Sequence, residues 1–295
     1  MDLKELANFL KIAEYENITK ASQELHIAQP HLTRQLQNLE QELGVTLFIR
    51  EKKRLHITDE GRFLKQQAKQ LIGLADKTKE QIFEMESGLS GTLYMGSIET
   101  IGTIYLPKWI ADFKKNYPKV RYNLWSGNSM DVIERLERGL IDLALVRAPF
   151  DLDKYDSLHI MDEEWIILIN QKHLLAQKET EFVSLEELSK EELLVPTQRI
   201  GEVSDWFRKN GLDSQIICGF APLMNAVVMV QNNLGIAILP NSCRQMLFTQ
   251  DITIKKLSEH ITSSVFLIWR KQYEIPGAAG RFLDFIQNLY ESNKT

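Results

Sequence analysis

The sequence predicts an α/β protein that has a mostly α-helical N-terminal winged helix-turn-helix, a long linker helix and a two-lobed α/β domain. Three observations lead to this prediction. Residues 21–61 have the pattern of a helix, a short turn, a second helix and a basic hairpin. Residues 59–87 contain no proline and carry a regular apolar repeat, and beyond residue 91 strand and helix patterns alternate. We therefore expect domains at 1–58, 59–87 and 88–295.

Capping residues and apolar spacing define the two helices of the helix-turn-helix. Asn17 can cap a helix whose inward face carries Ile18, Ala21 and Leu25. After a turn at residues 26–28, Pro30 fits the first turn of the next helix, where its missing N–H costs nothing. The apolar stripe of this second helix ends before Gly44 and consists of Leu32, Leu36, Leu39 and Leu43.

The other face of the second helix is polar. Side chains of these types reach base edges and phosphates when a helix lies in the major groove of DNA. The polar set comprises Gln29, His31, Thr33, Arg34, Gln35 and Asn38. The pattern therefore predicts double-stranded DNA as a partner.

A basic hairpin follows the second helix. Its tip carries Arg50, Lys52, Lys53 and Arg54, between apolar segments at 46–49 and 55–58. Contact with phosphates or the minor groove is the functional interpretation, and a solvated surface loop is the alternative. Residues 1–58 contain eight Lys/Arg and eight Asp/Glu, so any attraction to DNA must be local.

Residues 59–87 predict a helix that pairs with a second copy of itself. Apolar or small side chains recur at spacings of 4, 3, 4, 3, 4 and 3, as in a coiled-coil seam. They are Leu64, Ala68, Leu71, Ala75, Thr78, Ile82 and Met85. The alternative is an amphipathic helix packed on its own domain, although surface helices usually carry a wider apolar stripe.

The remainder of the chain predicts two small α/β lobes. Strands are expected at 92–98, 120–125, 142–146, 164–170, 215–220, 235–239 and 265–269. Helices are expected at 102–117, 129–138, 201–209, 223–232 and 278–290. We place lobe I at about 91–162 and 267–295, and lobe II at about 163–266.

Polar residues at strand ends predict a small-molecule site. Ligands in such sheets bind beyond the carboxyl ends of strands, where helix N-termini offer free amides to an anion. The candidates are Thr100, Asn128, Ser129 and Arg147, faced from the other lobe by Thr197, Gln198 and Arg199. They favour a small carboxylate or phosphate. Read singly, Ser129 is a helix cap and Arg147 is an ion-pair partner of Asp151 or Asp153.

Composition and absent motifs narrow the function. The start of the chain lacks the basic and then apolar order of a secretory signal, so we expect a cytoplasmic protein. Cys218 and Cys243 are expected to be inert buried thiols, with a redox switch as the alternative. The six histidines have no metal-ligand spacing, and phosphate-loop, dinucleotide and nucleophile-elbow motifs are missing. We expect no enzymatic activity, no cofactor and no metal.

Several segments together resemble the LysR-type transcriptional regulators. In the N-terminal part these are residues 21–30, Leu32-Thr33-Arg34-Gln35, Leu43-Gly44-Val45, Leu47-Phe48-Ile49-Arg50 and Thr58-Asp59-Glu60-Gly61. Downstream they are Leu106-Pro107, Gly127-Asn128-Ser129, residues 139–146 and residues 234–240. The similarity runs nearly from end to end.

The resemblance implies a periplasmic-binding-protein-like effector domain, a linker helix that pairs two chains, and bacterial homotetramers on DNA. It implies reading-helix roles for Gln29, Pro30, Thr33 and Arg34, and a wing role for Arg54. It also matches Thr100, Ser129 and Arg147 to effector-binding positions of carboxylate-binding members. Ala28 stands where the family commonly has a serine, and His31 replaces a usually small residue.

The leading interpretation is a DNA-binding transcriptional regulator that responds to a small metabolite, expected to be anionic. Its partners would be operator DNA, the effector, further copies of itself and, as a further candidate, RNA polymerase. One alternative is a small-molecule-binding protein whose N-terminal helices serve only oligomerisation. An enzyme is the weaker alternative, because the pocket candidates include no base beside a nucleophile.

Overall fold

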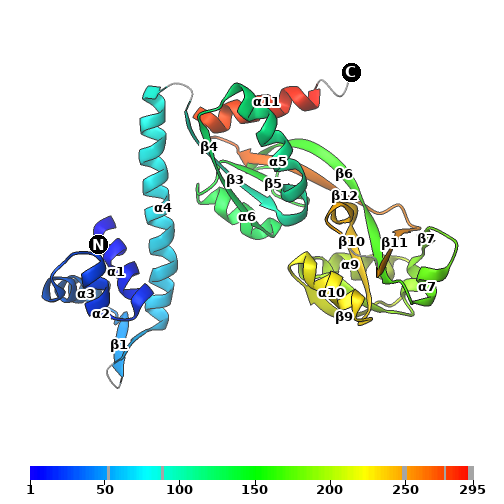
Figure 1. The fold of residues 1–295 in the computed structure, drawn as a ribbon, viewed down its shortest axis with the longest axis horizontal. Helices are drawn as coiled ribbons and strands as arrows, with labels where there is room; N and C mark the ends of the chain where they lie inside the picture. The colour runs from blue at the N-terminus through cyan, green and yellow to red at the C-terminus, as the bar shows by residue number, and fades with distance from the viewer. Residues whose placement is uncertain (52–53, 88–89, 248–250, 276, 292–295) are drawn as a thin grey trace. The chain divides into compact units, whose positions relative to one another are not determined.

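The computed structural model describes residues 1–51, 54–87, 90–247, 251–275 and 277–291. The chain forms two units, Met1–Gly88 and Leu89–Thr295 (Figure 1). In the part of the chain that is described, no helix is long and apolar enough to cross a membrane.

The N-terminal unit is a helical domain with a two-stranded hairpin and a long final helix (Figure 1). Its elements are α1 (Leu3–Tyr15), α2 (Ile18–Glu24), α3 (Gln29–Leu43), β1 (Phe48–Glu51), β2 (Arg54–Ile57) and α4 (Asp59–Ser87). β1 and β2 pair antiparallel. The predicted winged helix-turn-helix is confirmed, with the strands of the wing shifted by one or two residues from the expected positions.

Local sequence explains where these helices begin and end. The Asn17 side chain accepts a hydrogen bond from the backbone N–H of Lys20 at 3.1 Å, which caps α2. The Asp2 and Glu5 side chains form a capping box at the start of α1. Gly44 ends α3 with φ of 68°, a left-handed conformation that glycine adopts without steric cost.

A buried core joins the first three helices to the hairpin. Phe9 of α1 packs against Phe48 of β1 with ring centroids 5.6 Å apart, and Leu32 of α3 is fully buried. The Glu40 side chain accepts hydrogen bonds from the backbone N–H groups of Leu47 (2.7 Å) and Phe48 (3.2 Å). This carboxylate therefore fixes the entrance of the hairpin to α3.

The first turns of α4 pack on their own domain. Leu64 and Ala68 belong to the N-terminal core, with exposed fractions of 9% and 0%. The predicted continuous seam is therefore wrong at these two positions, where an apolar domain surface is already available. Farther along, Leu71 and Ile82 are 42% and 60% exposed, and the side chain of Met85 lies outside the described residues.

The C-terminal unit begins with a sheet covered by helices. This first part contains β3 (Gly91–Ile98), α5 (Glu99–Asn116), β4 (Val120–Gly127), α6 (Ser129–Glu137), β5 (Leu143–Arg147), β12 (Thr262–Arg270) and α11 (Gly277–Glu291). We call it lobe I. β3 pairs parallel with β4 and β5, and β12 pairs antiparallel with β5.

The second part, lobe II, contains α7 (Leu174–Gln177), β7 (Phe182–Val183), α8 (Leu185–Leu188), β8 (Glu192–Pro196), η1 (Thr197–Arg199), α9 (Ile200–Lys209), β9 (Gln215–Phe220), α10 (Leu223–Gln231), β10 (Ile236–Pro240), η2 (Asn241–Met246) and β11 (Ile252–Leu257). β8 pairs parallel with β9 and β10. Periodicity did not predict the short elements α7, β7 and α8 or the strands β8 and β11, because their apolar patterns are brief.

One long strand, β6 (Tyr155–Asn170), belongs to both lobes. Residues 155–164 pair with β12 in lobe I, and residues 165–170 pair with β10 and β11 in lobe II. The strand order is β4-β3-β5-β12-β6-β10-β8-β9 within the described residues. The sequence predicted only the second half of β6, where residues 165–169 form a continuous apolar run.

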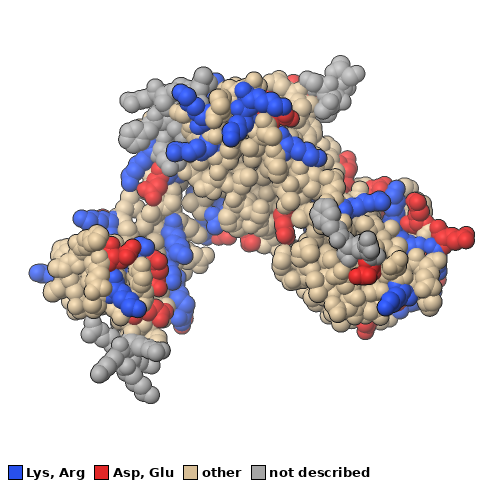
Figure 2. Space-filling view, in the orientation of Figure 1, with Lys and Arg blue, Asp and Glu red and all other residues tan. Residues whose placement is uncertain are grey.

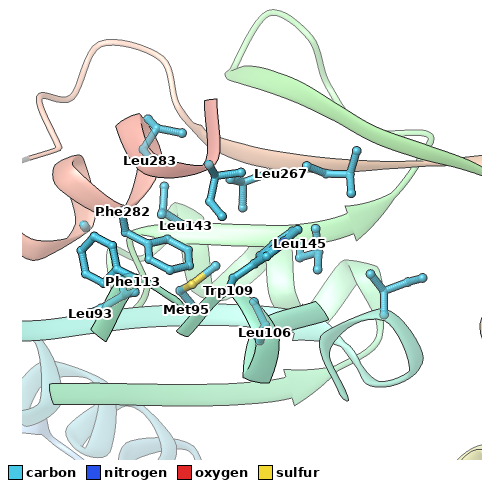
Figure 3. Packing of buried hydrophobic residues seen from close by; sticks show 14 of the residues in the cluster. Leu93, Met95, Leu106, Trp109, Phe113, Leu143, Leu145, Leu267, Phe282 and Leu283 are labelled. Carbon is cyan, nitrogen blue, oxygen red and sulfur yellow. The ribbon is translucent and has the colours of Figure 1, made fainter. Parts of the chain in front are cut away.

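Each lobe has its own apolar core. In lobe I, Phe113 of α5 and Phe282 of α11 pack with ring centroids 5.1 Å apart over Met95 of β3 (Figure 3). In lobe II, Trp165 of β6 packs against Trp206 of α9. These cores hold the strand ends, and hence the polar residues beyond them, in fixed register.

Two local predictions are corrected by the helix boundaries. α5 begins at Glu99 and not at residue 102, so Thr100 lies in its first turn. Asn128, not Ser129, caps α6, because the Asn128 side chain accepts a hydrogen bond from the backbone N–H of Asp131 at 2.9 Å. Ser129 is therefore the first residue of the helix.

Candidate DNA-binding and effector sites

Helix α3 presents a polar face to solvent. Gln29, Pro30, His31, Arg34 and Asn38 are exposed, while the intervening leucines are buried. Thr33 is half-buried, and its hydroxyl donates to the backbone carbonyl of Gln29 at 2.9 Å. This face can enter a groove while the opposite face stays in the domain core.

Gln35 has a structural partner. The Asn8 side-chain amide of α1 donates to the Gln35 side-chain carbonyl at 2.7 Å, and Asn8 is only 4% exposed. This bond ties the polar face of α3 to α1. The start of α3 differs, since Ala28 at the N-cap makes no side-chain hydrogen bond.

The predicted wing is the hairpin β1–β2. Lys52 and Lys53, and the side chains of Arg50 and Arg54, lie outside the described residues. The visible face of the N-terminal unit in Figure 2 carries both acidic and basic side chains. This mixture agrees with the equal numbers of Lys/Arg and Asp/Glu in residues 1–58.

A cavity of about 550 Å³ lies between the two lobes, at the carboxyl ends of β3, β4, β5, β8, β9 and β10. All seven predicted effector residues line it: Thr100, Asn128, Ser129, Arg147, Thr197, Gln198 and Arg199. The structure thus brings together residues from distant parts of the sequence. The arrangement is the one expected for ligand sites in open α/β sheets.

The walls of the cavity are largely apolar. The apolar lining residues include Ile98, Phe220, Pro222, Leu223, Leu239 and Pro240. These residues could not be predicted from the sequence, because apolar residues at strand and helix ends also fit ordinary cores. A small ligand here would meet a few polar groups on an apolar surface, as is usual for metabolite pockets.

Arg147 pairs with Glu163, which the sequence did not predict as its partner. The Arg147 guanidinium donates to the Glu163 carboxylate of β6, and the side chains are 7% and 1% exposed. Glu163 also accepts a hydrogen bond from the backbone N–H of Ser242. Among the described residues, Arg147 Nε has no hydrogen-bond partner. Glu163 was missed because it lies in mid-strand, where no positional rule marks a ligand residue.

Arg199 links the two lobes beside the cavity. Its guanidinium donates to the backbone carbonyl of Ala148 in lobe I at 3.3 Å and to the Glu202 carboxylate at 2.8 Å. Arg199 lines the cavity as well. The arginine therefore connects the end of β5 with the start of α9.

Cys243 lines the cavity but is a poor nucleophile. Burial, followed by the nearby charge of Glu163, raises the pKa of the Cys243 thiol to about 12. Both cysteines are free, and Cys218 is half-buried. Within the described ranges, no group of three His, Cys, Asp or Glu residues could hold a metal ion.

Two sequence models of known domains match the chain. The LysR substrate binding domain matches residues 86–291, and the bacterial regulatory helix-turn-helix domain of the lysR family matches residues 3–62. The chain belongs to the LysR family. It is a helix-turn-helix transcriptional regulator with an effector-binding domain, as the resemblance in the sequence predicted.

Curated LysR-family relatives match over nearly their whole length. The HTH-type transcriptional regulator BsdA of Bacillus subtilis (strain 168) is 27% identical over 295 residues, covering 96% of this chain and 99% of BsdA. The HTH-type transcriptional activator CmpR of Synechocystis sp. is 25% identical, covering 94% of this chain and 92% of CmpR. Activators are thus among the relatives.

Solved LysR-family structures share the fold. Full-length CbnR complexed with its target DNA superposes with a TM-score of 0.80 at 23% identity, covering 98% of this chain and 99% of CbnR. Full-length BenM has a TM-score of 0.59 at 25% identity, covering 100% of this chain and 98% of BenM. Because the sequence identity with CbnR is low, this comparison shows that the two proteins share a fold and nothing more.

Proposed function

We propose that α3 reads operator DNA directly and that the hairpin β1–β2 contacts the backbone or minor groove. The observation that carries the proposal is the exposed polar face of α3, on which Arg34 and Asn38 are free to reach base edges. The reading set is Gln29, Pro30, His31, Thr33, Arg34 and Asn38, and the wing set is Arg50, Lys52, Lys53 and Arg54.

α4 would pair two chains so that two heads bind successive turns of DNA. The exposed Leu71, Leu74 and Ile82 support this proposal, because they leave an apolar row beyond the part of α4 that packs on its own domain. Two linked heads offset the modest affinity expected of a neutral domain. Two such dimers would form the tetramer implied by the family resemblance, which acts on DNA in the cytoplasm, with RNA polymerase as a candidate further partner.

The effector would be a small metabolite with a carboxylate or other anionic group. The cavity supports this proposal through the Arg147 guanidinium, the Thr100 hydroxyl and the N-terminus of α6. We propose no catalysis, since the raised pKa of Cys243 keeps this cavity thiol protonated and unreactive at neutral pH. Effector binding between the lobes would change how dimers bind and bend DNA.

The test is selection of duplexes from fragmented genomic DNA by the full chain, followed by gel-shift titration at several salt concentrations. We expect one sequence class to be enriched and its affinity to fall steeply with salt, since phosphate contacts release counterions. Equal affinity for selected and unselected duplexes would remove the DNA-reading role and favour oligomerisation as the purpose of the N-terminal helices.

A further inference from the structure

The charged groups in the cavity wall and directly behind it are more often acidic than basic. Two arginines and two carboxylates line it, and each arginine already has a carboxylate partner behind it. The carboxylates are Glu99 and Asp131 in the lining, Glu163 with Arg147, and Glu202 with Arg199. Two guanidinium groups thus stand against four carboxylates. A ligand with only negative charge would be repelled by this set.

Glu99 is the carboxylate without a side-chain partner. It is half-buried at the start of α5, and among the described residues its carboxylate makes no hydrogen bond and no ion pair. Its charge acts inside the cavity, since it contributes to the raised pKa of Cys243. Asp131, by contrast, is exposed and accepts a hydrogen bond from the Asn128 side-chain amide. Glu99 is therefore free to bind a cation.

The Arg147 guanidinium lines the same cavity. The residue is 6% exposed, and its Nε has no partner among the described residues although the guanidinium is tied to Glu163. Nε itself is enclosed, so a ligand carboxylate would meet the edge of the guanidinium that lines the cavity. The backbone N–H groups at the start of α6, a helix of nine residues, add donors for the same anionic group.

The strand register places these groups next to one another. Ile98 of β3 pairs with Gly127 of β4, and Ser97 of β3 pairs with Leu145 of β5. Glu99 therefore follows the central strand, with Asn128 at the end of one neighbour and Arg147 at the end of the other. Neighbouring strands lie about 4.8 Å apart, which is close enough for one small molecule to reach all three ends.

We propose that the effector is an amino acid with an apolar side chain. Glu99 binds its ammonium group, the Arg147 guanidinium and the N-terminus of α6 bind its carboxylate, and Phe220, Leu223 and Leu239 contact its side chain. This assignment rests on the proposed effector function, and it adds a positive group to the carboxylate proposed there. A zwitterion brings no net negative charge into the cavity.

The experiment is isothermal titration of the full chain with matched probes at up to millimolar concentration. The probes are leucine, isoleucine, valine, methionine and phenylalanine, the deaminated acids 4-methylpentanoate and 3-phenylpropanoate, and the amines 3-methylbutylamine and 2-phenylethylamine. We expect at least one amino acid to bind, and its deaminated acid and decarboxylated amine to bind at least about tenfold more weakly. An acid that binds as tightly as its amino acid, or failure of every amino acid to bind, overturns the proposal.

A matched pair of variants assigns the ammonium site. Glu99→Gln should weaken amino-acid binding at least about tenfold and should no longer favour the amino acid over its deaminated acid. Asp112→Asn removes a carboxylate from the exposed part of the same helix, where it pairs with Lys115. This variant should change neither the affinity for the amino acid nor the preference for the amino acid over its deaminated acid. Unchanged preference in Glu99→Gln contradicts the proposal, provided that the ligand-free unfolding temperature shows a folded variant.

Failure here can be separated from failure of the proposed function. If a deaminated acid binds and shifts operator affinity, the protein is an effector-responsive regulator and only the amino-acid assignment is wrong. If no probe binds but selected duplexes are retained with normal salt dependence, DNA reading stands and the assignment again falls. If the wild-type chain bound all duplexes without sequence preference, the regulator proposal itself would be contradicted.

Discussion

Arg147 of β5 and Glu163 of β6 form a buried ion pair, with side chains 7% and 1% exposed. Glu163 also accepts from the backbone N–H of Ser242 in η2. The carboxylate therefore connects three elements at the point where β6 passes from lobe I into lobe II. An ion pair this deeply buried is costly to break, because its remaining member stays charged without a partner.

Glu163→Gln should lower the free energy of unfolding of the C-terminal unit by about 3 kcal/mol, since it leaves the Arg147 charge uncompensated. Urea unfolding followed by circular dichroism measures this change. Asp112→Asn breaks an exposed pair and should have little effect. Adding Arg147→Met to Glu163→Gln should restore part of the lost free energy of unfolding. If the double variant lost as much as the two single variants added together, the explanation would be contradicted.

The sequence predicted the effector cavity better than the pair behind it. Thr100, Asn128 and Arg147 could be found because they follow strands, and strand ends meet at one edge of an α/β sheet. Glu163 could not be found from the sequence, because a carboxylate in the middle of a strand has the same pattern as a solvent-facing residue. Its burial depends on β12 and η2, which come from residues about 80 to 100 positions away.

The helices of the N-terminal unit were predictable because their caps and apolar spacing are local. Asn17 and Gly44 mark boundaries without reference to any other element. The environment of the first turns of α4 was predicted wrongly, since Leu64 and Ala68 fit both a seam between chains and a domain core. Only the three-dimensional position of α1 and α3 decides between those two environments.

Arg34→Ala should weaken operator binding by about 1–3 kcal/mol and relax the preference for one base pair, if the guanidinium makes a bidentate base contact. Gel-shift titration against the selected duplex and its single-base variants measures both effects. Arg121→Ala on exposed β4 removes the same charge from the C-terminal unit and serves as the control. Equal losses in the two variants would point to bulk charge instead of base reading.

Replacing Leu71 and Ile82 together by glutamate should raise the dimer dissociation constant by about 100-fold or more, because each side chain would lose an apolar partner surface. Sedimentation equilibrium of the full chain measures the constant. Leu174→Glu, at another exposed apolar position in α7, should leave the constant unchanged. An unaltered dimer in the double variant would remove α4 from the interface.

Cys243 should resist alkylation in the native protein at neutral pH. Its thiol is fully buried, and burial raises its pKa to about 12, so very little thiolate forms. In a Cys218→Ser variant, iodoacetamide should modify Cys243 only after urea is added, as followed by mass spectrometry. Raising the pH to about 9 should still give little modification, because this remains well below the raised pKa. Rapid native labelling would reopen the redox alternative.

Gly61→Ala should damage the N-terminal unit through steric overlap and not through loss of a contact. A Cβ atom at residue 61 would lie 2.4 Å from the carbonyl oxygen of Leu47 and 2.6 Å from Cγ1 of Ile57. The carbonyl oxygen belongs to the backbone that leads into the hairpin, so α4 or the hairpin must move. We expect a loss of about 1–3 kcal/mol in the free energy of unfolding of this unit, measured by urea denaturation.

The same displacement should weaken duplex binding, because the hairpin would no longer hold its position beside α3. Gly201→Ala in α9 is the matched control, since nothing lies within 4 Å of the added methyl group. There the substitution should be neutral or stabilising, as alanine favours a helix over glycine. If Gly61→Ala were as stable as the wild type and bound the selected duplex equally well, the close packing of α4 on the hairpin would have no role in DNA binding.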